Sequence, residues 1–235
     1  MSEVLKIGLV AEGLTDYEVL NAAITAILGE RPFILTPLQP DDSVAFAGSA
    51  GPHGGGWKGV GRWCIQTVQR NAGRLRGDLL FSQHDVLIIH LDADVAGEVT
   101  DPGSQLAGLP CDRPCPPARQ TTDALRRVLL RWIGEPRLPG RTVFCTPSKS
   151  TEAWVMEACF PSDKEMVRRG KECHPKPENR LAQQPKSKRF AKTRASYREQ
   201  GSRIVKAWPA IASKLSEAGR FQVELKAAAL QRRRP

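Results

Sequence analysis

The stretch from Asp85 to Asp94 reads DVLIIHLDAD, and it carries the strongest fold signal in this chain of 235 residues. Its centre is a continuous apolar run, which is typical of a strand buried on both faces of a parallel sheet. The run leads directly into two carboxylates, Asp92 and Asp94. The stretch therefore predicts a central strand whose carboxyl end is acidic.

A second stretch of the same design lies nearer the N-terminus. Residues 6–16 read KIGLVAEGLTD, an apolar strand that ends at Glu12 and is followed by a helix start that contains Asp16. Parallel α/β sheets place their ligands beyond the carboxyl ends of the strands. If both strands lie in one sheet, we expect Glu12, Asp92 and Asp94 to emerge at the same edge.

Carboxylates gathered at one edge repel each other strongly unless a cation joins them. Hard oxygen ligands of this kind suit Mg²⁺ or Mn²⁺, so the two stretches predict a divalent-metal site. Each carboxylate also has a simpler interpretation as a solvated turn or first-turn residue. In a regular strand His90 shares a face with Asp92, and we interpret it as a buried structural histidine.

Strands and helices are expected to alternate along residues 4–160. Beside the strand that ends at Glu12, the expected elements are a helix over 15–29, a strand over 32–38, a helix over 57–73, a strand over 85–92, a helix over 120–134, a strand over 141–147 and a helix from 150. Expected helix caps are Thr15 in a capping box with Glu18, Thr122, and Ser150 or Thr151. This order predicts an α/β fold with a mostly parallel sheet flanked by helices.

Charge is distributed unevenly and divides the chain into two predicted units. Residues 1–163 hold 15 Lys and Arg against 19 Asp and Glu, whereas residues 164–235 hold 20 against 6. We therefore predict a catalytic domain over 1–163 and a basic, largely helical extension over 164–235, with a linker or exposed arm near 171–196. The basic extension favours nucleic acid, DNA or RNA, as a partner, although a merely solubilising tail is the alternative.

The six cysteines carry a weaker signal. Cys111 and Cys115 form a CxxxC in a proline-rich loop, and Cys173 precedes His174. Zinc binding by these four residues stays open, because their spacing fits no strong zinc signature. The start of the chain lacks the pattern of a secretory signal, and no apolar run reaches the length of a membrane span. We therefore expect a cytoplasmic protein without disulfides.

The acidic stretches together resemble the TOPRIM domain of topoisomerases, primases and OLD-type nucleases. The resemblance is carried by E-G-x-T-D over residues 12–16 and D-x-D over residues 92–94, each at a strand end. The later PSKSTEAW over residues 147–154 is similar to a segment of small TOPRIM-like proteins that are often encoded beside ATPases in bacterial anti-phage defence loci. The resemblance implies a TOPRIM-like Rossmannoid sheet and Mg²⁺-assisted phosphodiester chemistry.

The resemblance also implies residue roles. Glu12 would be a metal ligand or general base, Asp92 and Asp94 would hold metal, and Asp16 would add a further contact. Glu152 and Lys149 are similar to the second acidic site and the basic residue of OLD-type nucleases. A metal would activate water, and a lysine would stabilise the charged phosphate.

These observations predict a metal-dependent endonuclease, working in anti-phage defence with an ATPase partner. The alternative is a non-catalytic TOPRIM-like subunit that binds an ATPase or nucleic acid, because a fold does not determine a function. A third hypothesis, transfer chemistry on a nucleoside triphosphate, is weaker, since the chain has no P-loop sequence. The sequence leaves open DNA or RNA as substrate, the oligomeric state and the trigger.

Overall fold

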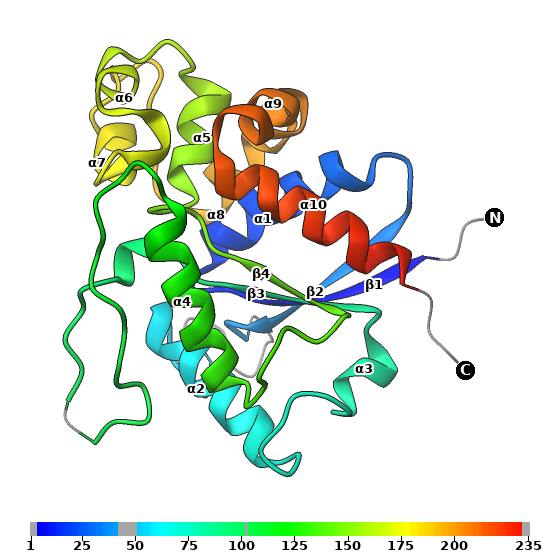
Figure 1. Ribbon diagram of the computed structural model, residues 1–235. Coiled ribbons are helices and arrows are strands. Elements are labelled where there is room, and N and C mark those ends of the chain that lie inside the picture. Colours follow the sequence, from blue (N-terminus) through cyan, green and yellow to red (C-terminus); the bar gives the residue numbers. More distant parts are fainter. Residues whose placement is uncertain (1–3, 42–50, 102, 232–235) are drawn as a thin grey trace.

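The fold is built on a four-stranded parallel sheet in the order β2-β1-β3-β4 (Figure 1). The computed structural model describes residues 4–41, 51–101 and 103–231. The strands are β1 (Leu5–Val10), β2 (Phe33–Gln39), β3 (Val86–His90) and β4 (Thr142–Cys145). All three neighbouring pairs are parallel, which confirms the predicted α/β architecture.

Helices cover both faces of the sheet (Figure 1). They are α1 (Leu14–Leu28), α2 (Gly56–Gln69), α3 (Leu80–Gln83), α4 (Arg119–Trp132), α5 (Glu152–Cys159), α6 (Lys164–Arg169), α7 (Pro177–Ala182), α8 (Arg194–Glu199), α9 (Gly201–Lys214) and α10 (Ser216–Leu230), with short 3-10 turns η2 (Ala93–Val95) and η3 (Lys171–Cys173). From β1 the chain moves toward one edge of the sheet to form β2, and it then moves toward the other edge to form β3 and β4. Because such crossovers are right-handed, α1 lies on one face and α2 and α4 lie on the other.

The change of direction creates a switch point between β1 and β3. These strands pair with Val10 beside Ile89, so the chain leaves both strands within a residue of the same level. Side chains of β3 alternate between the two hydrophobic layers, with Val86 and Ile88 toward α1 and Leu87 toward α2 and α4. Switch points are where open α/β sheets bind their ligands.

The C-terminal helices complete the hydrophobic layer on the α1 face. Helix α9 packs against α1 and α5, and α10 packs against α9 and β4. Trp154 of α5 meets the ring of Trp208 edge-on at 5.3 Å and stacks on Phe221 at 6.1 Å. The predicted domain boundary at residue 163 stays a prediction, and one hydrophobic cluster extends across it.

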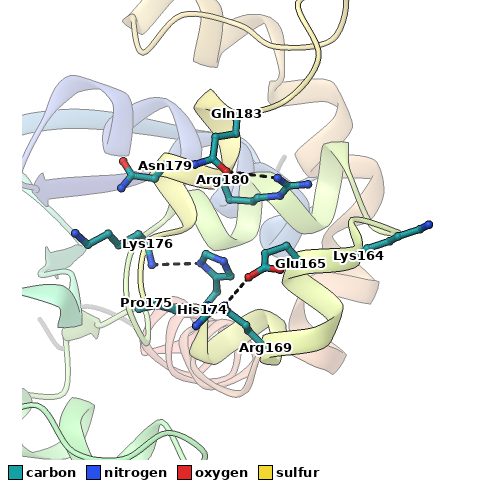
Figure 2. Close-up of a pocket in the computed structure, with 9 residues that line it drawn as sticks. All are labelled: Lys164, Glu165, Arg169, His174, Pro175, Lys176, Asn179, Arg180 and Gln183. Carbon is teal, nitrogen blue, oxygen red and sulfur yellow. Dashed lines mark hydrogen bonds and ion pairs between the residues drawn. The ribbon is translucent and has the colours of Figure 1, made fainter.

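The segment 171–196 was predicted to be a linker or an exposed arm, and this is wrong for much of its length. It contains η3, α7 and the start of α8, and Leu181 and Gln184 are buried. His174 lies buried between α6 and α7 (Figure 2). Leu181 inserts into the core and Phe190 packs against it, whereas Ala182, Ala191 and Ala195 are exposed.

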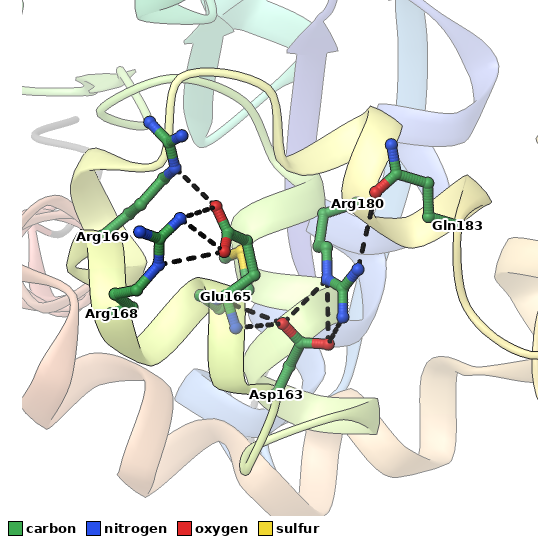
Figure 3. A network of polar contacts seen from close by, with 7 residues as sticks. Asp163, Glu165, Arg168, Arg169, Arg180 and Gln183 are labelled. Carbon is green, nitrogen blue, oxygen red and sulfur yellow. Dashed lines mark hydrogen bonds and ion pairs between the residues drawn. The ribbon is translucent and has the colours of Figure 1, made fainter.

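An ion pair ties this segment to the end of α5. Asp163 accepts hydrogen bonds from the backbone N–H groups of Glu165 and Met166, which caps α6. It also accepts from Arg180 of α7 through both carboxylate oxygens, at 2.7–3.0 Å (Figure 3). The Arg180 guanidinium holds the pKa of Asp163 well below its usual range. This contact orders α6 and α7 against each other.

Two of the predicted helix caps are wrong. Helix α1 begins at Leu14, so Thr15 lies inside its first turn. Helix α4 begins at Arg119, and the Thr122 hydroxyl donates to the Ala118 carbonyl 3.4 Å away. Thr151 occupies the N-cap position of α5, as predicted, but it makes no capping hydrogen bond, because its hydroxyl donates to Asp16 at 2.6 Å. A capping pattern in the local sequence cannot show that the hydroxyl will meet an acceptor on a distant helix, here Asp16 of α1.

The cysteines differ from the sequence-based expectation as well. Cys115 and Cys173 form a disulfide with their Cα atoms 5.4 Å apart, so the expectation of a chain without disulfides is wrong. The disulfide takes two of the four groups considered for zinc, and the Cys111 thiol is free. The His174 Nδ1 atom accepts a hydrogen bond from the Lys176 backbone. A zinc site of these four residues is therefore excluded in this structure.

Membrane insertion was not expected from the sequence. Among the described residues, every helix is too short or too polar to span a lipid bilayer. A cytoplasmic location stays a prediction.

We expect Trp208→Ala to lower the free energy of unfolding by about 3–5 kcal/mol, because Trp208 is 2% exposed and anchors α9 in the shared core. Urea denaturation followed by far-UV circular dichroism measures this loss. Val223→Ala on the exposed side of α10 is the control, with an expected change below about 0.5 kcal/mol. Early melting of α9 and α10 alone, with the sheet unaffected, would contradict a shared core.

Candidate metal centre

The candidate centre lies where β1 and β3 end, at the switch point of the sheet. The Asp92 backbone N–H donates to the Glu12 Oε1 atom at 2.7 Å, which joins the two predicted acidic stretches directly. Glu12, His90 and Asp92 each offer one ligand atom, and these atoms lie within 4.8 Å of one another. Two carboxylates and an imidazole at this spacing can hold a divalent cation.

His90 is the member of this trio that we had assigned a structural role. Its Nε2 atom lies 3.0 Å from Asp92 Oδ1, and its side chain is fully buried. Its Nδ1 atom is buried and has no hydrogen-bond partner within the described part of the chain. A buried polar atom without a hydrogen-bond partner, surrounded by carboxylates, is the feature expected where a further group binds. The signal in the sequence was the shared strand face of His90 and Asp92.

Asp16 and Asp94 stand beside the trio. Asp16 is buried on α1 and accepts the Thr151 hydroxyl, which connects α1 to the start of α5. Asp94 lies in η2, where its backbone N–H donates to the Lys149 carbonyl at 3.0 Å. Both carboxylates act electrostatically on Asp92. The fold therefore brings Glu12, Asp92 and Asp94 to one edge, as the two stretches predicted, and it places Asp16 beside them.

The assembled carboxylates perturb each other's titration. Burial raises the pKa of Glu12 well above its usual value, and the charge of Asp92 raises it further. Burial also raises the pKa of Asp92, with Asp16, Asp94 and Glu152 adding to the effect. Partial burial together with Glu178 raises the pKa of Asp94 to about 6. A cation would relieve this mutual repulsion, which is the electrostatic condition for a metal site.

Glu152 opens α5 and borders the same group. Its Oε1 atom accepts from the Tyr197 hydroxyl at 3.1 Å and from the Lys192 ammonium at 2.8 Å. Burial opposes ionisation of Glu152, but the Lys192 charge and the hydrogen bonds to the carboxylate together outweigh it, so the pKa of Glu152 lies below its usual value. Lys192 and Tyr197 were missed by sequence analysis, because they lie in and beside the segment interpreted as a linker. No local signal marks such residues.

Lys149 is placed differently from the predicted role. Its Nζ atom donates to both carboxylate oxygens of Asp112, at 2.9 and 2.7 Å. Its side chain is only 9% exposed, and its charge is compensated by the loop that carries Asp112. The structure brings Glu152 to the carboxylate group, whereas the Lys149 ammonium is directed to this loop.

The glycine-rich segment at the start of α2 forms a backbone hydrogen bond with Glu12. The Gly56 N–H donates to the Glu12 carbonyl at 2.9 Å, with Gly56 at a φ of +64° that favours glycine. At Gly59, in the first turn of α2, a Cβ atom would lie 2.2 Å from the Gly54 carbonyl oxygen, so this position tolerates only glycine. The part of the loop over residues 42–50 lies outside the described residues. The described part holds the Glu12 backbone in place.

Comparison with known proteins adds no further constraint. No protein-family model, curated protein or solved structure matches this chain. The TOPRIM resemblance therefore stays a prediction. The functional argument rests on the contacts and charges of the centre itself.

We expect Glu12→Gln to raise the melting temperature in EDTA at pH 7 by about 2–4 °C, which corresponds to about 1 kcal/mol. A raised pKa means that ionised Glu12 costs stability at neutral pH, and glutamine can still accept the Asp92 N–H. The gain should shrink toward pH ~4, where Glu12 is largely protonated in the folded and unfolded states alike. Scanning calorimetry measures both effects.

The same variant should lose stabilisation by Mn²⁺. Saturating Mn²⁺ at about 100 times its Kd should stabilise the wild type by about 2.7 kcal/mol. Glu30→Gln, at an exposed position after α1, is the matched control and should keep this response. Equal Mn²⁺ stabilisation of Glu12→Gln and the wild type would rule out Glu12 as a ligand.

Proposed function

We propose that this chain is a Mg²⁺- or Mn²⁺-dependent endonuclease with a TOPRIM-like Rossmannoid domain. The observation that carries the proposal is the junction of Glu12, His90 and Asp92 within 4.8 Å at the switch point of a parallel sheet. The excess of Lys and Arg in residues 164–235 supports a polyanionic substrate such as DNA or RNA. A role in anti-phage defence beside an ATPase partner follows from the sequence resemblance alone.

The donor set fits a divalent cation. Glu12, Asp92 and the His90 imidazole would hold it, with Asp16, Asp94 and Glu152 completing the acidic edge. The bound cation would supply activation of water and neutralisation of charge on the leaving oxygen. Hydrogen bonds within the chain orient the two glutamates. The Asp92 N–H donates to the Glu12 carboxylate, and the Tyr197 hydroxyl donates to the Glu152 carboxylate.

We assign the phosphate-stabilising cation to Lys192 in place of Lys149. Lys149 is buried and neutralised by Asp112. The Lys192 side chain is 62% exposed, and its charge acts on Glu152, Asp16 and Asp92. An ammonium that reaches solvent beside the acidic edge can meet a phosphate, since it is not enclosed by its partner.

Plasmid, single-stranded DNA and total tRNA incubated with the chain and Mn²⁺ should be cleaved, and Asp92→Ala should abolish cleavage, because this change removes a ligand. Gel electrophoresis with and without EDTA measures it, with Glu30→Ala as the control that retains activity. Cleavage by Asp92→Ala in EDTA would overturn the nuclease proposal. Absence of Mn²⁺ binding at millimolar concentration would favour the non-catalytic subunit.

Lys192→Gln should lower the cleavage rate by a factor on the order of a hundred while Mn²⁺ binding is retained, because the charge on the phosphate loses its partner. Lys149→Gln removes the same charge and should retain at least about half of the rate. The assay temperature is set well below the melting temperature of this variant, so that the protein is folded. Single-turnover kinetics and calorimetric Mn²⁺ titration separate these effects. The reverse ranking of the two variants would return the role to Lys149.

A further inference from the structure

A hollow of about 770 Å³ lies at the carboxyl end of α5, outside the metal centre. Its walls are the end of α5, the turn over 160–163, the segment 184–190 and the start of α9. Two aromatic residues, Phe160 and Phe190, line it, together with Lys188, Arg189, Arg203 and one carboxylate, Asp163, which pairs with Arg180. Its volume lies in the range of sites that hold small organic ligands.

The chemistry of the lining favours a nucleotide. Phe160 and Phe190 are half-buried, so part of each ring is accessible to a flat, apolar group. Lys188, Arg189 and Arg203 are exposed, and no carboxylate in the described part of the chain forms an ion pair with them. Aromatic faces bind bases by stacking, and free cations bind phosphate. The two requirements of a nucleotide meet in this hollow.

A neighbouring hollow between α6 and α7 shows the contrast. It measures about 560 Å³ and is also lined by basic residues (Figure 2). There Arg169 pairs with Glu165 at 2.5 Å, and Arg180 pairs with Asp163 at 2.7 Å (Figure 3). Its arginines are already neutralised, and its lining has no aromatic ring other than His174. Lys164 and Lys176 also line it without an ion pair in the described part of the chain, so the feature that distinguishes the hollow at the end of α5 is its pair of phenylalanine rings.

The hollow is connected to the metal centre through two short paths. The Phe190 ring meets the Tyr197 ring edge-on at 5.6 Å, and the Tyr197 hydroxyl donates to Glu152. Lys192, two residues after Phe190, pairs with the same carboxylate. Glu152 and Cys159 mark the two ends of α5, which is about 10 Å long at 1.5 Å per residue.

We propose that this hollow binds one unstacked nucleotide of a single-stranded segment that flanks the bond positioned at the metal centre. The base lies against Phe160 and Phe190, and its phosphate meets Lys188 and Arg203. A paired base cannot enter, because both of its faces are stacked in the duplex. The inference deepens the nuclease proposal and rests on it, since it names the form of nucleic acid that the site accepts.

Fluorescence anisotropy with a labelled single-stranded oligonucleotide tests the inference, with the full chain in EDTA so that no cleavage occurs. We expect Lys188→Gln with Arg203→Gln to weaken binding about tenfold or more, because two phosphate contacts are lost. The control is Arg70→Gln with Lys226→Gln, which removes the same charges at exposed positions just after α2 and on α10 and should change binding less than about twofold. Equal weakening by both pairs would overturn the inference.

Phe190→Leu tests stacking separately from charge. It keeps an apolar side chain against Tyr197 and removes the aromatic face, so we expect about fivefold weaker binding or more. A duplex of the same sequence should compete poorly, and a free mononucleotide should compete weakly. Competition by duplex as strong as by single strand would overturn the inference, as would a mononucleotide that binds as tightly as the strand.

Melting curves of each variant show that it is folded before its binding is compared. Calorimetric Mn²⁺ titration of the same variants should match the wild type, because none of them alters the metal centre. If the wild type cleaves nucleic acid while the hollow variants bind normally, the inference fails alone. If the hollow variants lose binding while the wild type never cleaves, the nuclease proposal fails alone.

Discussion

The adjacency of β1 and β3 is the constraint on which the site depends. Their pairing lets the Asp92 N–H reach Glu12, so one hydrogen bond of 2.7 Å joins carboxylates from distant parts of the chain. The same pairing gathers further acidic groups whose mutual repulsion raises their pKa values. Folding therefore assembles a site that is electrostatically unfavourable by itself and favourable with a cation.

The basic C-terminal region compensates this acidity in part. Lys192 pairs with Glu152, while Arg194 and Arg198 of α8 pair with Glu18 of α1. The hydrophobic side of the same region inserts Trp208 between the helices of the sheet's outer layer. The region is thus both a structural layer and one wall of the candidate centre, which is why its charge bears on function.

The opposite wall is held by the loop that precedes α4. The disulfide from Cys115 to Cys173 ties this loop to η3. The same loop supplies Asp112 to Lys149, and the Ser148 hydroxyl donates to the Glu172 carbonyl beside the disulfide. The turn between β4 and α5 is therefore clamped on both sides. Such a rigid support positions Thr151 and Glu152 toward the carboxylate group.

The sequence by itself determined the alternation of strands and helices and the acidic ends of β1 and β3, because apolar runs and strand-end carboxylates are local patterns. It did not determine the approach of His90 to Glu12, the ion pair of Lys192 with Glu152, the compensation of Lys149 by Asp112 or the disulfide. Only the tertiary structure decided these, because each depends on which distant segments become neighbours. Strand order and packing select those neighbours, and neither is encoded in any single stretch of residues.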